Sequence, residues 1–120
     1  MEPPARRYFT YPEAVALLPQ VREITAEAFA QSEEIQSQLA TVTHDERYAD
    51  LQEQLNELLQ AWANSILVLG VEVKGLWTVD FDSGDGIYYC WVWPEPSLEY
   101  FHHYDSGFSA RRPLGSLRTG

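Results

Sequence analysis

The sequence WANSILVLGVEVKGLWTVDF, residues 62–81, changes at Gly70 from a helical to a strand pattern of apolar residues. Before Gly70, apolar residues recur every three or four positions, at Trp62, Ile66 and Leu69, which is typical of an amphipathic helix. After Gly70 the period falls to two and β-branched and aromatic residues dominate, which predicts β-strand. Glycine readily takes the left-handed conformation just past a helix, so Gly70 fits this junction. The sequence therefore predicts helices first and a sheet second.

Two helices are predicted before that boundary, and each opens with a capping signal. Thr10 stands three positions before Glu13, and Thr43 stands three positions before Glu46. In this spacing the threonine side chain accepts a backbone N–H and the glutamate accepts one in return. Apolar residues then follow at helical spacing in both segments, and the link between the segments is short. The pattern predicts a long antiparallel helical hairpin.

Pro19 lies inside the first predicted helix. Proline lacks an N–H and clashes with the carbonyl four residues earlier, so we expect it to kink the helix or divide it. A helix of about 30 residues is about 45 Å long, whereas a compact chain of this length has a radius of gyration of about 14 Å. The helices should outreach the rest of the domain, which favours a homodimer formed through the helices and the aromatic sheet.

The predicted sheet is small, antiparallel and aromatic. Residues 71–81 form its first strand, the turn-forming residues 82–86 follow, and residues 87–93 return as a strand that is apolar on both faces. Residues 97–102 supply a third strand. We therefore predict an α+β fold with about three strands, comprising a single domain over residues 1–114 and a loose tail over 115–120.

Charge and composition exclude several functions. The 120 residues carry 18 acidic and 8 basic side chains, for a net charge of -10, and Lys74 is the single lysine. Nucleic acids and anionic membranes are approached through clustered lysine and arginine, so neither is an expected partner. The sequence shows no secretory signal and no apolar stretch long enough to span a membrane. Cys90, the single cysteine, sits among apolar residues and reads as a buried thiol in a reducing compartment. We predict a cytoplasmic protein.

One segment concentrates side chains that carry chemistry. Glu95, His102 and Asp105 lie within eleven positions, from residue 95 to residue 105, and imidazole with carboxylate can bind a divalent transition metal or act as acid and base. These three residues are the candidates for a catalytic or metal site. The alternative is structural: His102 would be a partly buried ring bonded to Asp105 or a backbone carbonyl, and Glu95 would pair with an arginine.

Other candidates are weaker. Arg111 and Arg112 could hold a carboxylate or phosphate, or pair with the chain's own carboxylates. Trp91 and Tyr100 are further candidates for lining a ligand pocket beside Arg111. The aspartates at positions 80, 82 and 85 alternate around the predicted hairpin tip and are read as turn-forming residues, since they match no calcium-binding loop.

Several motifs occur together in an order that resembles a known family. They are Tyr8-Phe9-Thr10 with Ala16-Leu17-Leu18-Pro19, Leu69-Gly70-Val71-Glu72-Val73-Lys74, Val79-Asp80-Phe81, Cys90-Trp91 with Glu95-Pro96, Tyr100-Phe101-His102, and Gly107-Phe108 with Arg111-Arg112-Pro113. The chain resembles, from residue 8 to residue 114, a family of small bacterial proteins catalogued as a domain of unknown function. The resemblance implies that the family's characteristic positions are Asp80, Trp91, Glu95, His102, Gly107 and Arg111. Pro94 and Phe101 depart from the family's usual glycine and tryptophan.

Two functional hypotheses follow from the sequence. The first is a non-catalytic dimeric module that binds a protein partner through its aromatic surface and acidic helices. The second is a small metal-binding protein or enzyme in which Glu95, His102, Asp105 and Arg111 meet at one pocket.

Overall fold

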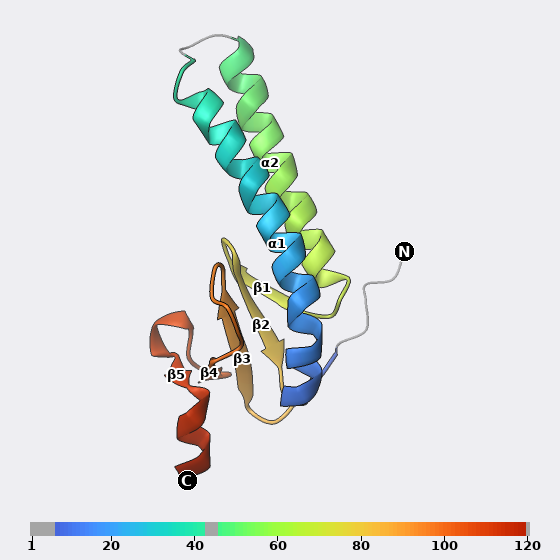
Figure 1. Cartoon of the computed structure of the whole chain (residues 1–120), viewed down its shortest axis with the longest axis vertical. Coiled ribbons are helices and arrows are strands. Elements are labelled where there is room, and N and C mark those ends of the chain that lie inside the picture. Colours follow the sequence, from blue (N-terminus) through green and yellow to red (C-terminus); the bar gives the residue numbers. More distant parts are fainter. Residues whose placement is uncertain (1–6, 43–45, 120) are drawn as a thin grey trace.

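The computed structural model describes residues 7–42 and 46–119, which form a helical hairpin followed by a sheet (Figure 1). Helix α1 (Tyr11–Leu39) and helix α2 (Glu46–Leu67) lie side by side and antiparallel. The antiparallel sheet runs in chain order, with strands β1 (Glu72–Gly75), β2 (Thr78–Asp82), β3 (Ile87–Val92), β4 (Tyr100–His103) and β5 (Arg112–Pro113). The 3-10 helices are η1 (Phe108–Ala110) and η2 (Leu114–Thr119), so η2 occupies the predicted tail. The α+β class and the helical hairpin are confirmed.

Helix α1 begins with the capping box that the sequence predicts. The Thr10 hydroxyl accepts the backbone N–H of Glu13 at 3.2 Å, and the Glu13 carboxylate accepts the backbone N–H of Thr10 at 2.8 Å. The second predicted box, at Thr43 and Glu46, falls partly outside the described residues. Pro19 lies within one continuous helix, so it does not divide α1. Because Pro19 has no N–H, the carbonyl of Val15 lacks its usual helical donor. Val15 is exposed, so water can donate to that carbonyl instead.

The sheet has five strands where the sequence predicted about three. The main difference is a hairpin inside the first predicted strand: β1 and β2 pair with Gly75 opposite Thr78, which leaves a two-residue turn at Leu76 and Trp77. Trp77 adopts a positive φ of 59°, a conformation that aromatic residues rarely take. Its ring is buried against Trp62 at 4.9 Å and Phe29 at 5.8 Å between ring centroids. Gly75 precedes the turn, but neither of its two central residues is of a turn-forming type, so packing of the Trp77 ring imposes the positive φ.

The hydrophobic core lies between the helices and one face of the sheet. Val79 and Phe81 of β2 and Trp91 of β3 point from the sheet into a core that also holds Val21 of α1 and Ile66 of α2, all fully buried. Because side chains alternate along a strand, the intervening residues of β2 and β3 point to the opposite face. That opposite face carries the polar groups described in the next subsection.

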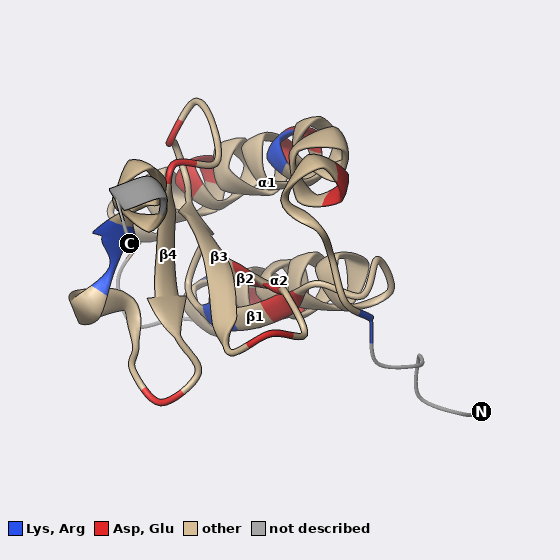
Figure 2. Cartoon of the chain, turned by 90° about the horizontal axis from the view of Figure 1, so that it is seen from below, with Lys and Arg blue, Asp and Glu red and all other residues tan. Residues whose placement is uncertain are grey.

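The hairpin extends beyond the sheet, as its predicted length required (Figure 1). The molecule measures 57 × 34 × 25 Å and its radius of gyration is 16.6 Å, against about 14 Å for a compact chain of this length. Acidic residues are distributed over the helices and the loops of the sheet (Figure 2). In the described ranges, neither helix is both long enough and apolar enough to cross a bilayer.

A buried hydrogen bond links the two helices and offers a test of the packing. The indole N–H of Trp62 donates to the Thr25 hydroxyl at 2.9 Å, and Thr25 is fully buried. We expect Thr25→Val to lower the free energy of unfolding by about 1–3 kcal/mol, because it leaves a buried indole N–H without an acceptor. Urea unfolding followed by far-UV circular dichroism measures this.

A second substitution isolates the bond itself. Trp62→Phe should destabilise the Thr25→Val protein less than it destabilises the original chain, because the hydrogen bond is already absent there. Equal effects of Trp62→Phe in both backgrounds would show that the two side chains are not coupled.

Candidate metal centre

The face of the sheet turned away from the helices holds buried polar side chains. Asp80 and Asp82 alternate with the core residues of β2 and are each 1% exposed. Both aspartates are residues of β2. The turn-forming role predicted for Asp82 is found, because its Oδ1 accepts the backbone N–H of Gly84 at 2.8 Å, whereas the turn-forming role predicted for Asp80 is wrong, because Asp80 lies within the strand and contacts His102. Buried carboxylates are costly unless they are paired or bind an ion. This face therefore needs an explanation beyond turn formation.

The strand register brings three potential metal ligands together. Asp80 of β2 stands directly opposite Cys90 of β3, and His102 of β4 stands opposite Tyr88, two residues along β3 from Cys90. An oxygen of Asp80, Sγ of Cys90 and a ring nitrogen of His102 all lie within 4.8 Å of one another. All three side chains are buried, His102 being the most exposed of them at 4%. We name Asp80, Cys90 and His102 the buried triad.

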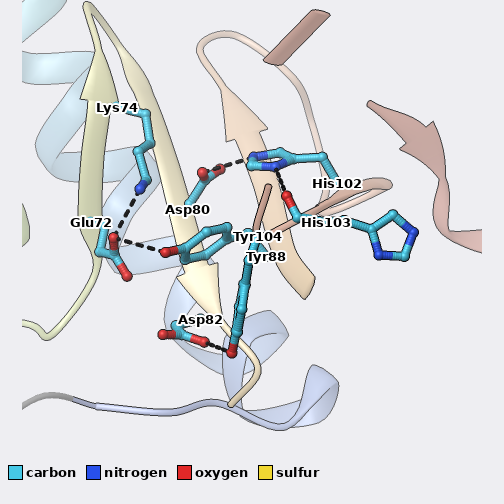
Figure 3. A network of polar contacts seen from close by, with 8 residues as sticks. All are labelled: Glu72, Lys74, Asp80, Asp82, Tyr88, His102, His103 and Tyr104. Carbon is cyan, nitrogen blue, oxygen red and sulfur yellow. Dashed lines mark hydrogen bonds and ion pairs between the residues drawn. The ribbon is translucent and has the colours of Figure 1, made fainter. Parts of the chain in front are cut away.

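The two ring nitrogens of His102 both have partners. Nδ1 lies 3.0 Å from the backbone carbonyl of His103, and Nε2 lies 2.8 Å from Oδ2 of Asp80 (Figure 3). A carbonyl can only accept, so Nδ1 carries a proton and donates it. The bond to the His103 carbonyl favours the tautomer with its proton on Nδ1, and Nε2 then faces Asp80 and Cys90.

The second oxygen of Asp80 is not satisfied in the same way. Oδ1 is buried and has no hydrogen-bond partner of ordinary geometry in the described part of the chain, although the Cys90 thiol is close enough to donate to this carboxylate. Burial raises the pKa of Asp80, and the neighbouring His102 opposes that rise. A buried carboxylate oxygen without a donor is unusual in a folded protein and is the kind of atom that an ion or a water satisfies.

Cys90 completes the triad from the next strand. Burial, together with the Asp80 carboxylate beside it, raises the pKa of the Cys90 thiol to about 12, while Arg111 opposes the rise. The free side chain is therefore a neutral thiol at physiological pH and a poor nucleophile. This confirms the sequence-based interpretation of Cys90 as buried, and it leaves metal coordination as the chemistry open to this sulfur, because a bound cation deprotonates a coordinating thiol.

The segment after β4 lines the cavity beside the triad, and Arg111 holds this segment in place by pairing with Glu95. The guanidinium of Arg111 forms two parallel contacts with Glu95, at 3.0 Å to Oε1 and 2.9 Å to Oε2, and both side chains are largely buried. The same guanidinium lies 4.2 Å from the ring centroids of Tyr100 and Phe108. The backbone N–H of Val92 also donates to Glu95 at 3.0 Å. These contacts hold the loop containing η1 against β3 and β4.

A polar network extends from the triad along the same face. The Glu72 carboxylate lies 3.0 Å from the ammonium of Lys74 and accepts the Tyr88 hydroxyl at 3.3 Å (Figure 3). Lys74 also lies over the Tyr88 ring, 4.4 Å from its centroid. On the other side, the Tyr104 hydroxyl donates to Asp82. The triad is therefore flanked by a cation and by tyrosine hydroxyls.

A cavity of about 350 Å³ opens onto the triad. Its wall includes all three triad residues together with Lys74, Thr78, Tyr88, Tyr104, Ser106 and Phe108. This volume is within the range of small-molecule sites. A second, wider groove of about 570 Å³ is lined by Tyr11, Tyr89, Leu98 and Leu114 and contains none of the triad. The smaller cavity is the one in which buried ligands and a binding space coincide.

The residues proposed from the sequence do not lie in one site. His102 belongs to the triad, whereas Glu95 and Arg111 pair with each other, and Asp105 is exposed in the turn after β4. Trp91 is in the core with its indole N–H donated to the Glu95 carbonyl, and Tyr100 stacks on Arg111. Arg112 is exposed on β5. The structural alternative for Glu95, pairing with an arginine, is the arrangement found.

The sequence does not show that Asp80 and Cys90 join His102, because its local pattern indicates a turn for Asp80 and core packing for Cys90. The signal for Asp80 was available, because an aspartate between Val79 and Phe81 inside an apolar strand is an anomaly. The convergence with Cys90 and His102 depends on the register of three strands, which the sequence does not display.

The fold and the triad define an α+β protein with a candidate metal centre on the face of its sheet turned away from the helices. Over residues 7–114 the chain matches the family described as uncharacterized conserved protein, DUF2203. The chain belongs to this family, which confirms the resemblance to a domain of unknown function. No curated protein and no solved structure matches it.

The Arg111–Glu95 contact provides a test of how the loop is held. We expect Arg111→Lys to lower the free energy of unfolding by about 1–3 kcal/mol, since an ammonium cannot reproduce the bidentate pairing or the stacking on two rings. The matched control is Arg112→Lys at the exposed neighbouring position, where the change should stay within about 0.5 kcal/mol. Similar losses at both positions, measured by urea unfolding, would contradict this account.

Proposed function

We propose that this protein binds one divalent transition-metal ion through Asp80, Cys90 and His102. The observation that supports the proposal is the convergence of a buried carboxylate, thiol and imidazole within 4.8 Å. It is strengthened by the buried Oδ1 of Asp80, which lacks a partner among the described residues. The three groups come from adjacent strands of one sheet, so a rigid backbone positions them.

The spacing of the triad is compatible with a tetrahedral ion. Metal–ligand distances of about 2.0–2.3 Å place tetrahedral ligand atoms about 3.3–3.8 Å apart. Nε2 and Oδ2 are now 2.8 Å apart, and the three ligand atoms spread to at most 4.8 Å, so the tetrahedral value lies between these limits. Small side-chain rotations bring all three atoms to that distance.

The surroundings of His102 also match those of a metal ligand. Histidines that bind metals usually donate the other ring N–H to a carbonyl or carboxylate, which fixes the tautomer. The contact of Nδ1 with the His103 carbonyl is such a bond and leaves Nε2 facing Asp80 and Cys90. A thiolate, an imidazole and a carboxylate together favour zinc, with cobalt(II) as a spectroscopic substitute, over calcium or magnesium.

Cobalt titration of the untagged, chelator-treated chain tests the proposal. We expect uptake of one Co²⁺ per chain, with a thiolate-to-cobalt charge-transfer absorption band and displacement of Co²⁺ by Zn²⁺. Cys90→Ser should abolish the band, and His102→Gln should weaken Co²⁺ binding by about 100-fold or more, because each removes one of the three ligands. Urea unfolding of each variant establishes that it is folded.

The matched control is His103→Gln, which removes the adjacent but exposed imidazole. It should bind Co²⁺ as the original chain does. If the original chain takes up no ion, or if His102→Gln and His103→Gln bind Co²⁺ equally, the proposal is wrong.

The shape of the molecule supports a second proposal, a homodimer formed through the hairpin. The hairpin projects beyond the sheet (Figure 1), and its apolar residues Ile35, Leu39 and Leu55 are half-buried although Leu51 is buried, so a second copy could cover them. Sedimentation equilibrium should then give twice the chain mass of 13.8 kDa, falling to one chain mass in a Leu55→Lys variant. A single chain mass at micromolar concentration in the original protein would contradict the dimer.

A further inference from the structure

We infer that the proposed metal site takes a small oxyanion, a carboxylate or a phosphate, held between the ion and the ammonium group of Lys74. The inference rests on the proposed function and adds the chemical class of the bound molecule. It is carried by the shared cavity, in which Lys74 and the three triad residues form parts of the same wall.

The triad would leave one position of a tetrahedral ion open. Structural zinc sites have four protein ligands, whereas sites with three leave a position for water or for a substrate. In the described ranges the triad is the one group of at least three histidine, cysteine or acidic side chains able to hold an ion, and it contains three members. Each of them reaches the wall of the 350 Å³ cavity, so an exchangeable ligand would enter from that cavity.

Lys74 supplies a positive charge near the triad. Asp80 and the Cys90 thiolate would together balance the two positive charges of the ion. Arg111 is paired with Glu95, and Lys74 is the lysine or arginine in the cavity wall. Lys74 is the chain's single lysine, lies two residues after Glu72, the β1 residue paired with Asp80, and is near enough to the Asp80 carboxylate to interact with it. Its Nζ lies 3.0 Å from Glu72 and 4.4 Å from the Tyr88 ring centroid. An ammonium group has three N–H donors, so contact with Glu72 does not use all of them.

The volume and lining of the cavity limit which anions it can hold. A cavity of about 350 Å³ fits a small molecule and excludes a polymer. The hydroxyl groups of Thr78 and Ser106 and the rings of Tyr88 and Phe108 complete the wall, which suits a compact acid with a short apolar body. With a net charge of -10 the surface as a whole repels anions, so anion binding should be confined to a site that supplies local positive charge.

The experiment uses the full chain loaded with one Co²⁺ and freed of excess ion. Inorganic phosphate and acetate are titrated separately at constant ionic strength, while the visible cobalt spectrum is recorded. We expect at least one of the two anions to change the spectrum saturably, because it replaces a coordinated water. Saturation by both identifies a general oxyanion site, and saturation by one identifies which of the two groups it prefers.

Substitution of Lys74 tests the second half of the inference. Lys74→Gln should weaken the anion by about tenfold while Co²⁺ uptake stays at one ion per chain, and Lys74→Arg should restore most of the affinity because it retains the charge. Arg112→Gln removes one positive charge from an exposed position outside the cavity wall and should leave the anion affinity unchanged.

The outcomes separate this inference from the metal proposal. If Co²⁺ binds but neither anion alters the spectrum, the inference is overturned and the metal site stands. If Lys74→Gln and Arg112→Gln weaken the anion equally, the role of Lys74 is overturned, because general electrostatics then accounts for the effect. If no Co²⁺ binds, both proposals fail together.

Discussion

The pairing of β2 with β3 is the constraint on which the rest of the molecule depends. It sets Asp80 opposite Cys90 and, on the other side of the same two strands, Val79 opposite Trp91. Because side chains alternate, one register supplies both the apolar face that the helices cover and the polar face that holds the triad. A shift by one residue would turn Asp80 into the core and Val79 out of it. The hydrophobic core therefore fixes the geometry of the candidate site.

Much of the fold could be predicted because its signals are local. The capping residues Thr10 and Glu13, the helical spacing of apolar residues and the stop at Gly70, which takes a φ of 84°, each act within a few positions. The extra hairpin could not be predicted, because Trp77 is held at positive φ by contacts with Phe29 and Trp62 from distant segments. The helical periodicity persists through Pro19 because its lost hydrogen bond falls on the exposed side of α1.

The candidate site was predictable only in part, for the same reason. His102 stands out in the sequence because histidine is scarce here and acidic residues surround it. Its partners do not lie in that acidic segment: Asp80 is 22 positions earlier and Cys90 belongs to another strand. The nearby Glu95 is instead engaged by Arg111. Proximity along the chain is a weak guide to ligand sets in a sheet, where neighbours across strands share a face.

The buried triad is difficult to explain by stability alone. A buried carboxylate paired with an imidazole generally stabilises a fold less than apolar side chains of similar volume, because desolvation offsets the attraction. Here one oxygen of the carboxylate has no hydrogen-bond partner among the described residues, and Arg111 holds the loop beside it through Glu95 and the Phe108 ring. An ion at the triad would give the buried Asp80 carboxylate a cationic partner. The groups that are costly in the empty site are therefore the ones that a bound cation would stabilise.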